Sequence, residues 1–501
     1  MKNIKDIIIV GGGTSGWMSA AFLAKMTQGK YNIRLVESNI IGTIGVGEAT
    51  IPAIKTFNSL LGIDEKEFIQ ATQGTFKLGI QFCHWGAIGE QYLHGFGPIG
   101  RQWEWLSFYQ YWLKLKSLNK VNSLDDFSIN NQIALANSFS PARPDMPKSP
   151  LRDVAYAYQF DAGLYGRFLR SFSEKLGVQR TEGTITQVKK HPENGFIQSL
   201  LLANGEEISG DLFIDCSGMR GLLIEQTLKT GFEDWSHWLP CDRAIAVPSK
   251  RTEPLLPYTR STAHQSGWQW RIPLQHRTGN GHVYASEFST EQQAQDTLIK
   301  HLDGEMLAEP RLIKFATGKR KKAWNRNCVA IGLSAGFLEP LESTSLYLVQ
   351  TAITRLVNLF PDNSFNQANI DHYNRQADFE IEKIRDFIIA HYKVTQRDDS
   401  EFWRYCKNMT IPDSLQQKLD IFQGYGRVER QADELFREES WVQVLVGQNM
   451  LPMQYDPFVD LKTQQELEFF VNNTQAVIKN CLTNLPSHTE FIAQHCLAKS
   501  K

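Results

Sequence analysis

A carboxylate beside the start of a predicted helix is the first feature of this sequence that could do chemistry. Residues 340–345 read Pro-Leu-Glu-Ser-Thr-Ser, and apolar residues recur at helical spacing from Leu346 onward. A helix should therefore begin near Ser343 or Thr344, where free backbone amides and the helix dipole suit a small anion. Glu342 directly precedes this turn. Two interpretations fit the stretch alone: an ordinary helix cap near an acid, or an anion site with a carboxylate beside it.

A lysine in an alternating segment is the second candidate. Residues 75–82 alternate between polar and apolar side chains, which is typical of a strand with one buried face. Lys77 belongs to the polar set. A lysine on such a face is usually solvated, but a desolvated lysine can act as a positioned hydrogen-bond donor or as a nucleophile. If folding brings Lys77 next to Glu342, the two could serve as an acid/base pair.

The amino-terminal segment carries a complete dinucleotide-binding fingerprint. An apolar run over residues 7–10 predicts a buried strand, and residues 17–26 predict a helix. Between them lies a glycine loop that would approach a pyrophosphate. Its candidate cofactor-binding residues are Gly11, Gly13, Thr14, Ser15 and Gly16. A second predicted strand ends at Glu37, about 20 residues farther on, where an acid accepts from a ribose hydroxyl. The fingerprint predicts a dinucleotide without separating FAD from NAD.

Three further segments could contact a ligand. Residues 42–52 form a glycine-rich loop, which either approaches a flat ligand or simply connects two elements. Residues 91–115 are dense in aromatic side chains, which either pack in a core or line a pocket for a flat substrate. Trp268 and Trp270 fall on one face of a predicted strand, where they either pack in the core or wall a site.

Length and composition indicate a large globular protein. The chain has 501 residues, of which 42% are hydrophobic, and its formal net charge is −1. This balance argues against nucleic acid or an anionic membrane as a partner. The amino-terminal apolar run is too short for a signal peptide, and no stretch of about 18 apolar residues predicts a membrane span. Seven cysteines without a CxxC pair predict neither disulfides nor a metal site, so a reducing cytoplasm is the expected location.

Seven motifs together resemble the flavin-dependent halogenases of the tryptophan-halogenase family. They are GGGTSGW, GEATIP, FKLGIQF, YQFDAGLYGRFLR, DLFIDCSGMRGLLI, WQWRIP and FLEPLESTS, in family order up to about residue 360. The resemblance implies an α/β (α+β) chain with a two-dinucleotide, aromatic-hydroxylase-like FAD-binding fold and a helical substrate-binding module. We expect residues 1–100 and 151–366 to form the FAD-binding module. Residues 101–150 and 367–501 should form the mainly helical module, with a junction in the proline-rich stretch 138–150.

The resemblance also implies an activity, that of an FADH2-dependent halogenase in a two-component flavin system. A separate flavin reductase would supply FADH2, which reacts with O2, and a halide (chloride or bromide) would be oxidised to hypohalous acid. Lys77 would receive this oxidant, either as a haloamine or through a hydrogen bond. Glu342 would polarise the oxidant or take the proton from the substrate, an electron-rich aromatic such as an indole or a phenol.

Other positions acquire expected roles by resemblance alone. Thr344 and Ser345 match the halide site, and His94 and Phe96 match a His-x-Phe pair at the substrate pocket. Trp268 and Trp270 would close the flavin site. The remaining matches are a backbone contact to adenine at Ile185, positions beside the flavin at Leu333 and Leu346, and the strap over the cofactor at Ala49.

Two departures from the family pattern argue against free tryptophan as the substrate. Tryptophan-specific members carry glycine where this chain has Ser345, so a positive φ angle there would cost about 1 kcal/mol. They also carry a late segment for the amino acid's backbone, to which residues 438–455 are only roughly comparable. Two other functions stay open, a flavin monooxygenase that hydroxylates an aromatic and a flavin-binding protein without turnover. A homodimer, common among relatives, is a further expectation.

Overall fold

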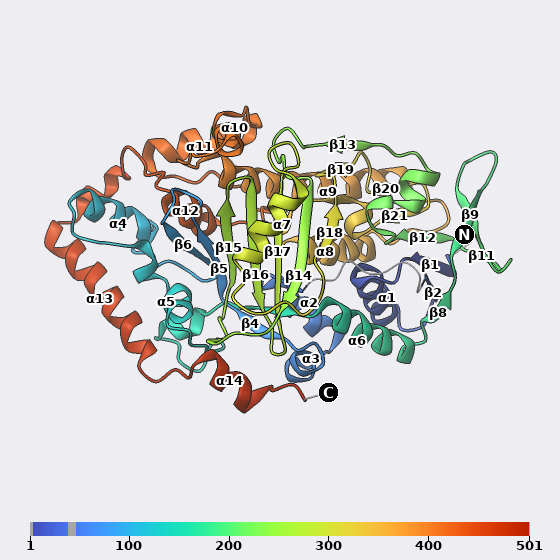
Figure 1. The fold of residues 1–501 in the computed structure, drawn as a ribbon, viewed down its shortest axis with the longest axis horizontal. Coiled ribbons are helices and arrows are strands. Elements are labelled where there is room, and N and C mark those ends of the chain that lie inside the picture. The colour runs from blue at the N-terminus through green and yellow to red at the C-terminus, as the bar shows by residue number, and fades with distance from the viewer. Residues whose placement is uncertain (1–3, 39–46, 500–501) are drawn as a thin grey trace. The chain divides into compact units, whose positions relative to one another are not determined.

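The computed structural model describes residues 4–38 and 47–499, which fall into two compact units (Figure 1). Unit 1 comprises residues 1–73, 160–242 and 314–382, and unit 2 comprises residues 74–159, 243–313 and 383–501. The last boundary falls inside helix α9 (Gln367–Lys393).

Unit 1 contains three sheets and helices on both sides of the largest one. Its strands are β1 (Asp6–Val10), β2 (Asn32–Glu37), β3 (Glu48–Ala49), β8 (Gln179–Glu182), β9 (Ile185–Lys190), β10 (Ile197–Leu202), β11 (Glu207–Ser209), β12 (Leu212–Asp215), β13 (Phe232–Asp234), β19 (Gly318–Arg320), β20 (Trp324–Asn325), β21 (Cys328–Ala330) and β22 (Gly336–Phe337). Its helices are α1 (Thr14–Thr27), α2 (Ala53–Leu61), α3 (Glu65–Ala71), α6 (Ala162–Lys175) and α8 (Ser345–Asn358). Short turns of helix are η3 (Gly218–Arg220), η4 (Leu222–Thr227), η5 (Gly332–Ser334) and η6 (Pro340–Glu342).

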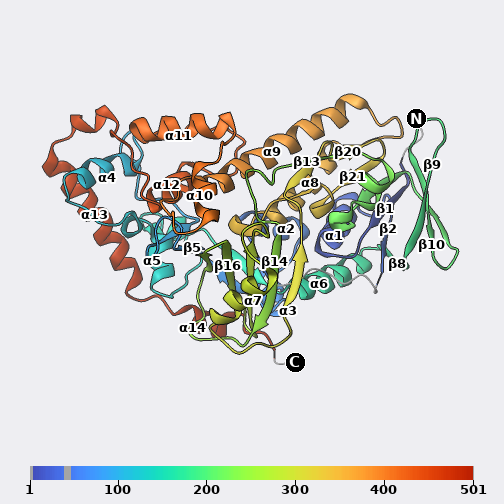
Figure 2. The same ribbon diagram turned by 45° about the horizontal axis from the view of Figure 1, so that its top comes forward.

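The central sheet of unit 1 has the order β20-β21-β12-β1-β2-β8, and all its pairs except β20-β21 are parallel. Strand β1 is buried on both faces, as its unbroken Ile-Ile-Ile-Val run predicts. On one face Ile8 and Val10 pack with the antiparallel sheet β9–β11. Helices α1 and α6 lie side by side next to β1, β2 and β8 in both ribbon views (Figures 1 and 2). These layers form a sheet covered on both sides, the usual arrangement for a dinucleotide-binding fold.

Unit 2 combines an antiparallel-rich sheet with most of the helices that follow residue 383. Its strands are β4 (Thr75–Lys77), β5 (Gly79–Cys83), β6 (Gln91–Gly95), β7 (Ala157–Phe160), β14 (Arg243–Ser249), β15 (Thr259–His264), β16 (Gly267–Pro273), β17 (Thr278–Tyr284) and β18 (Arg311–Lys314). Its helices are α4 (Phe108–Ser117), α5 (Ile129–Leu135), α7 (Glu291–Lys300), α10 (Glu401–Asn408), α11 (Asp413–Tyr425), α12 (Glu438–Gly447), α13 (Gln464–Leu482) and α14 (His488–His495). Turns η1 (Leu124–Phe127), η2 (Pro150–Asp153) and η7 (Pro457–Leu461) complete it.

Seven strands of unit 2 form one sheet in the order β18-β14-β17-β16-β15-β5-β6. Strand β5 pairs in parallel with β15 and antiparallel with β6, which ties the segment after Lys77 to the segment that carries Trp268 and Trp270. The long helix α13 runs past α4 and α5 (Figure 2).

The bounds of the two units differ from those of the two modules expected from the sequence. Residues 74–100 and 243–313 were assigned to the FAD-binding module but belong to the same compact unit as the late helices. The physical reason is strand pairing, because β5 and β6 complete the sheet that β14 to β17 build. Such pairing joins segments that are remote in the sequence, and local patterns do not reveal it. Which module binds FAD and which binds substrate remains a prediction.

Two searches over residues 4–38 and 47–499 gave negative results. No helix there is long and apolar enough to cross a membrane. No group of three or more His, Cys, Asp or Glu side chains in those ranges could hold a metal ion.

Candidate active site

The glycine loop of unit 1 has the geometry that a bound dinucleotide requires. Gly11 has a φ of +113°, so a side chain would be strained there, and its N–H donates to the Val36 carbonyl at 2.9 Å. A Cβ on Gly16 would lie 1.9 Å from the Gly11 carbonyl oxygen. Beside Gly13, in contrast, there is open space. The loop is therefore tight against its own strand and helix but accessible where a pyrophosphate would approach.

Helix α1 begins without a side-chain cap, because its N-cap residue is Gly13. The amides of its first turn are available to an anion. Glu37 ends β2 next to this loop, since a Cβ on Gly12 would lie 1.5 Å from the Glu37 Oε2 atom. Arg180 donates from Nε to Glu37 Oε1, and this bond raises the pKa of Arg180. The uncapped amides and the carboxylate together fit a dinucleotide.

The residues expected near the adenine lie beyond Glu37. The Glu37 carbonyl accepts from the Gly183 N–H at 2.8 Å, and the hydroxyls of Ser38 and Thr184 lie 3.1 Å apart. Ile185 follows directly as the first residue of β9 and is half-buried. The segment around Ile185 thus joins the edge of the predicted nucleotide site.

The predicted cofactor strap is described only in part. Gly42 and Gly45 lie outside the described residues. Ala49 lies in the two-residue strand β3 and is half-buried. Its neighbour Glu48 is also half-buried, and burial raises the pKa of that carboxyl to about 7.

The turn after β21 approaches the glycine loop. The Ile331 N–H donates to the Asp215 carbonyl at 2.9 Å, and a Cβ on Gly332 would lie 2.9 Å from the Ser15 Cβ. Leu333 therefore sits in a turn that contacts the start of α1. Leu346, in the first turn of α8, is buried. The two residues expected beside the flavin accordingly lie in segments that the tertiary structure of unit 1 holds near α1.

The stretch Pro340–Ser345 places a buried carboxylate before an uncapped helix. Glu342 ends η6 and is only 1% exposed. Thr344 is buried and occupies the N-cap of α8, but its side chain makes no capping hydrogen bond. The helix begins at Ser345, one residue after the predicted range. The Thr344 side chain therefore does not cap the first amides of α8, which is compatible with an anion site there.

The positive φ angle in this stretch belongs to Ser343, at +58°, and not to Ser345. The expected cost at Ser345 therefore does not arise, because that residue has already joined the helix. The chain must instead turn between η6 and α8, and Ser343 makes that turn in the left-handed conformation. A non-glycine residue in this conformation costs about 1 kcal/mol.

Lys77 is completely buried, at 0% exposure, so the interpretation of a solvated lysine is wrong. The expected single strand is interrupted at Leu78, whose N–H donates to the Pro257 carbonyl at 2.7 Å. Strand β4 pairs antiparallel with β7, placing Lys77 opposite Ala157, and β5 joins the large sheet. Both faces of the segment are covered as a result. The alternation of polar and apolar residues predicted a strand in this segment. It did not reveal that a second layer of the protein covers the polar face of that strand.

The two residues expected at the substrate pocket lie in the same part of unit 2 as Lys77. The Lys77 Nζ atom is 5.2 Å from the centroid of the Phe96 ring, within the range of a cation–π contact. The Phe96 N–H donates to the Leu78 carbonyl at 3.0 Å. His94 is buried in β6. The tertiary structure therefore joins the predicted catalytic lysine to the predicted His-x-Phe pair.

His94 contacts the aromatic residues Phe387 and Phe436, and Trp441 packs on Phe387 behind them; none of the three was predicted. The ring centroids of Phe387 and His94 are 5.7 Å apart, and Phe387 stacks on Phe436 at 3.8 Å. Trp441 meets Phe387 edge-on at 4.8 Å. The sequence gives no local signal that would pair these residues with His94, because they lie in segments remote from it.

Trp268 and Trp270 pack together in β16, with ring centroids 6.2 Å apart, and both are buried. The indole of Trp270 lies over Gly281 of β17, where a Cβ would come within 2.1 Å of the ring. Its Nε1 atom makes no hydrogen bond among the described residues. The two packed indoles form one buried aromatic surface. Its place beside a flavin remains a prediction, as does the pairing of Lys77 in unit 2 with Glu342 in unit 1.

The layered sheet and the glycine loop of unit 1 define a dinucleotide-binding α/β protein. Over residues 6–464 the chain matches the tryptophan halogenase family, and it belongs to that family. It is 36% identical to the tryptophan 7-halogenase RebH of Lentzea aerocolonigenes, with 98% of each chain covered.

Solved structures of related proteins agree with this assignment. The flavin-dependent halogenase Xcc4156 from Xanthomonas campestris is 44% identical and superimposes with a TM-score of 0.96 over 100% of both chains. BrvH, a flavin-dependent halogenase from Brevundimonas sp. BAL3, is 42% identical, with a TM-score of 0.94 over 98% of this chain and 99% of BrvH. The predicted fold class is confirmed. The chain is a flavin-dependent halogenase, an enzyme that uses a flavin and a halide to halogenate aromatic substrates.

Proposed function

We propose that this enzyme uses FADH2, O2 and chloride or bromide to make hypohalous acid, which Lys77 receives and delivers to an electron-rich indole or phenol. The observation that carries the proposal is the complete burial of Lys77 beside Phe96. A fully buried lysine is uncommon, because removing an ammonium from water is costly unless it gains partners or a function. A dry ammonium next to aromatic side chains suits an oxidant that must be kept from bulk water.

FAD would bind along the glycine loop of unit 1. The uncapped amides of α1 would hold the pyrophosphate, Glu37 would accept from the ribose, and Ile185 would contact the adenine. Leu333 and Leu346 would lie beside the isoalloxazine, and Ala49 would belong to the loop that straps the cofactor. When bound in reduced form, delivered by a separate reductase, the flavin supplies the electrons that activate O2.

The halide would bind at the start of α8, where Thr344 and Ser345 offer backbone amides with no side-chain cap. Ser345 keeps the N–H that a glycine would supply there. Hypohalous acid then transfers its halogen to a ring carbon, and the ring loses a proton. Glu342 is the group proposed to accept this proton and to pass it to the hydroxide that the oxidant leaves behind, which then departs as water.

The proposed substrate is an aromatic without a free amino-acid backbone. In the segment 438–455, one acidic and one phenolic side chain already have hydrogen-bond partners within unit 2. Ser107 donates to the Glu438 carboxylate at 2.6 Å, and burial raises the pKa of Glu438. Tyr455 donates to Asp460 at 3.1 Å. Because Glu438 and Tyr455 already have these partners, we do not assign them to the ammonium or the carboxylate of free tryptophan.

The test combines product analysis with a lysine variant. A panel of indoles and phenols is incubated with purified enzyme, a flavin reductase, FAD, O2 and halide. The products are then identified by mass spectrometry. A halogen isotope pattern supports the proposal, whereas one added oxygen would identify a monooxygenase. No product across the panel would leave a flavin-binding protein without turnover.

Lys77→Met should lower product formation by at least about 100-fold, the usual contribution of a positioned proton donor. Methionine fills the lysine's volume, so the fold should persist. Peroxide release should continue, since the flavin site is intact. Lys148→Met, at an exposed lysine of the same unit, serves as the control and should behave like the wild type. Halogenation retained in Lys77→Met would refute the role of Lys77.

A further inference from the structure

Strand β6, which carries His94, lies at the edge of the seven-stranded sheet of unit 2. On one side it pairs with β5, and on the other side no strand of the described residues pairs with it. Such an edge presents backbone N–H and C=O groups without a partner strand. Residues 92–95 are nevertheless buried, so these groups need partners within the protein.

The side-chain amide of Gln443, which lies on α12, supplies both partners for Gly95. Its Oε1 atom accepts from the Gly95 N–H at 3.0 Å, and its Nε2 atom donates to the Gly95 carbonyl at 3.1 Å. The backbone fixes which way round this amide lies, because a peptide N–H can only donate and a peptide carbonyl can only accept. One side chain therefore takes the place of a neighbouring strand on this side of β6.

The rest of the Gln443 amide is hydrogen-bonded as well. Its Oε1 atom also accepts from Asn131 Nδ2 at 3.0 Å, and its Nε2 atom also donates to the Glu439 carbonyl at 3.1 Å. Asn131 lies on α5 and donates to the Leu93 carbonyl at 3.2 Å, and a Cβ on Gly95 would lie 1.8 Å from its Oδ1 atom. Both lone pairs and both N–H groups of Gln443 are thus engaged, which leaves its amide a single orientation. Gln443 and Asn131 form an amide clamp on β6.

Gly95 stands between the two residues expected at the substrate pocket, His94 and Phe96. Side chains two residues apart on an extended chain point to the same side. The Phe96 N–H donates to the Leu78 carbonyl at 3.0 Å, and the centroid of its ring is 5.2 Å from the Lys77 Nζ atom. The amide clamp on Gly95 therefore sets where His94 and Phe96 lie relative to Lys77.

We propose that Gln443 is a positioning residue that determines which ring carbon of the substrate is halogenated. It acts through the backbone of Gly95, which fixes the distance between the His94–Phe96 pair and the Lys77 ammonium. Gln443 has this role only if Lys77, His94 and Phe96 act as proposed above. Since a displacement of about 1 Å in such a site can cost about 100-fold in rate, a loosened pair should let the substrate react in several orientations.

The test replaces Gln443 with methionine, which keeps the volume of the side chain but forms neither bond to Gly95. Wild type and Gln443→Met are given 3-methylindole or phenol with the same reductase, FAD, O2 and halide as above, and chromatography separates the halogenated isomers. The wild type should make mainly one isomer from each compound. In Gln443→Met the ratio of major to minor isomer should fall at least about tenfold. Peroxide release without substrate should be the same in both, because the glycine loop belongs to unit 1.

Gln110→Met is the matched control, since it makes the same replacement at another buried glutamine of unit 2. Gln110 is 4% exposed and Gln443 is 5% exposed. The Gln110 amide donates to the Tyr425 carbonyl at 3.0 Å and accepts from the Asp456 N–H at 2.8 Å, so it also bridges backbone groups. Both variants should lower the melting temperature, but Gln110→Met should keep the isomer ratio of the wild type.

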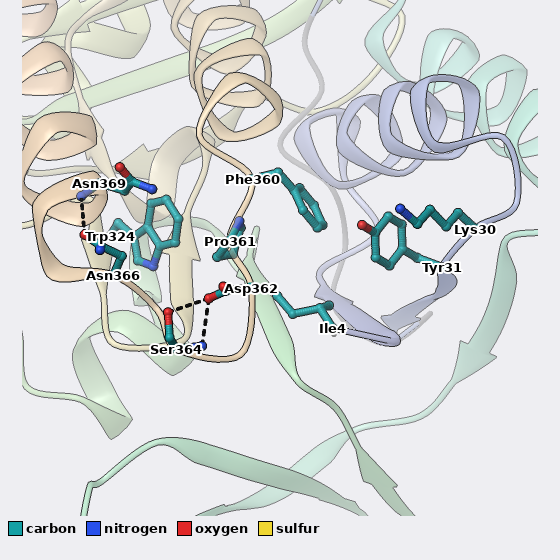
Figure 3. Close-up of a pocket in the computed structure, with 10 residues that line it drawn as sticks. All are labelled: Ile4, Lys30, Tyr31, Trp324, Phe360, Pro361, Asp362, Ser364, Asn366 and Asn369. Atoms are coloured by element: carbon teal, nitrogen blue, oxygen red, sulfur yellow. Dashed lines mark hydrogen bonds between the residues drawn. The ribbon is translucent and has the colours of Figure 1, made fainter. Parts of the chain in front are cut away.

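A second control lies in the cavity of about 510 Å³ that Figure 3 shows. Its lining residues, among them Phe360 and Asp362, all belong to unit 1, whereas the amide clamp and Lys77 belong to unit 2. The cavity therefore contains none of the residues expected at the substrate pocket. Phe360→Ala should leave the isomer ratio unchanged.

Two results would overturn the proposal. One is the wild-type isomer ratio in folded Gln443→Met. The other is an equal change of the ratio in Gln110→Met, which would trace the effect to a general loosening of unit 2. Melting temperatures show whether each variant is folded. If Gln443→Met does not fold, Gln443→Asn replaces it, because that side chain keeps an amide but is one methylene shorter and cannot reach both groups of Gly95.

A wild type that makes no halogenated product would refute the proposed function instead. The amide clamp is then tested by hydrogen exchange of peptides that cover residues 91–97. Exchange there should be faster in Gln443→Met than in the wild type and in Gln110→Met. Equal exchange in all three proteins would overturn the clamp as well.

Discussion

At the scale of the residue, the proposed chemistry depends on two buried charged side chains. Lys77 is 0% exposed and Glu342 is 1% exposed, although charged residues are seldom fully buried. Burying such groups costs free energy that only partners or function can offset. A third residue, Ser343, adds backbone strain directly after Glu342. Strain and buried charge together are the reasons for proposing a functional role for the turn before α8.

Replacing Ser343 should reveal that strain. Because Ser343 has a φ of +58°, Ser343→Gly should be more stable than Ser343→Ala by about 1 kcal/mol. The comparison with alanine removes the effect of losing the hydroxyl. Urea unfolding of both variants measures the difference in free energy of unfolding. Equal stabilities would mean that the left-handed turn is not strained.

A side chain at Gly13 should abolish flavin binding without unfolding the protein. Gly13 has φ −74° and ψ −177°, which valine adopts readily, and the space beside it is open. Gly13→Val would fill the place expected for the pyrophosphate. In the wild type, FAD at 100 times its Kd should raise the free energy of unfolding by about 2.7 kcal/mol. We expect no such rise for Gly13→Val. Gly166→Ala, where a Cβ also meets nothing within 4 Å, is the control.

At the scale of the element, the helices differ in how their first turns are capped. Helices α7, α13 and α14 each begin with a complete capping box. The N-cap residues of α1 and α8 make no side-chain capping bond, and neither do those of α2, α4, α11 and α12. A missing cap therefore permits an anion site without identifying one. A cap contributes about 1 kcal/mol, so omitting it leaves amides whose best partner is an anion. The starts of α1 and α8 coincide with the predicted pyrophosphate and halide sites.

Gly281 in β17 leaves the space that the Trp270 indole of β16 occupies, so a larger residue at position 281 should displace the indole. A methyl group there would come within 2.1 Å of the ring, so Gly281→Ala must displace it. Overpacking of this kind costs about 1–3 kcal/mol. If Trp270 walls the flavin site, the variant should also release more peroxide per halogenated product. Gly424→Ala, in open space on α11, should cause neither change. An unchanged ratio of peroxide to product would argue against the wall.

At the scale of the whole molecule, buried histidines link stability to pH. His488 accepts from the Phe76 N–H at 3.1 Å and donates to the Leu255 carbonyl at 2.9 Å, which requires the neutral ring. Burial lowers the pKa of His488 to about 4. Burial likewise lowers the pKa of His282 to about 4 and that of His264 to about 3.

These shifts predict acid-induced loss of stability. A histidine whose pKa is lower in the folded protein contributes stability above its unfolded pKa of about 6.5, and this contribution is lost as the pH falls toward 4. For His488 alone the loss approaches roughly 3 kcal/mol. Urea unfolding at a series of pH values should show a shallower decline in His488→Gln than in the wild type. His495→Gln, at an exposed histidine of the same helix, should follow the wild type.

The sequence by itself determined the features that depend on neighbouring residues. The apolar run of β1, the glycine loop and the acid of Glu37 form one local unit, so the dinucleotide-binding fold was predictable. The start of α8 beside Glu342 was predictable within about two residues for the same reason. The specific motifs also sufficed to indicate the family.

Tertiary structure alone decided what covers each element. Alternation placed Lys77 on a polar strand face, but pairing with β7 and with residues remote in the sequence buried it. The aromatic neighbours of His94 lie almost 300 residues or more away, Phe387 in α9 and Phe436 just before α12, and no local periodicity predicts such a contact. Strand pairing also set the bounds of the two units. Local sequence fixes periodicity and turn chemistry, whereas burial depends on which distant segments pack against each face.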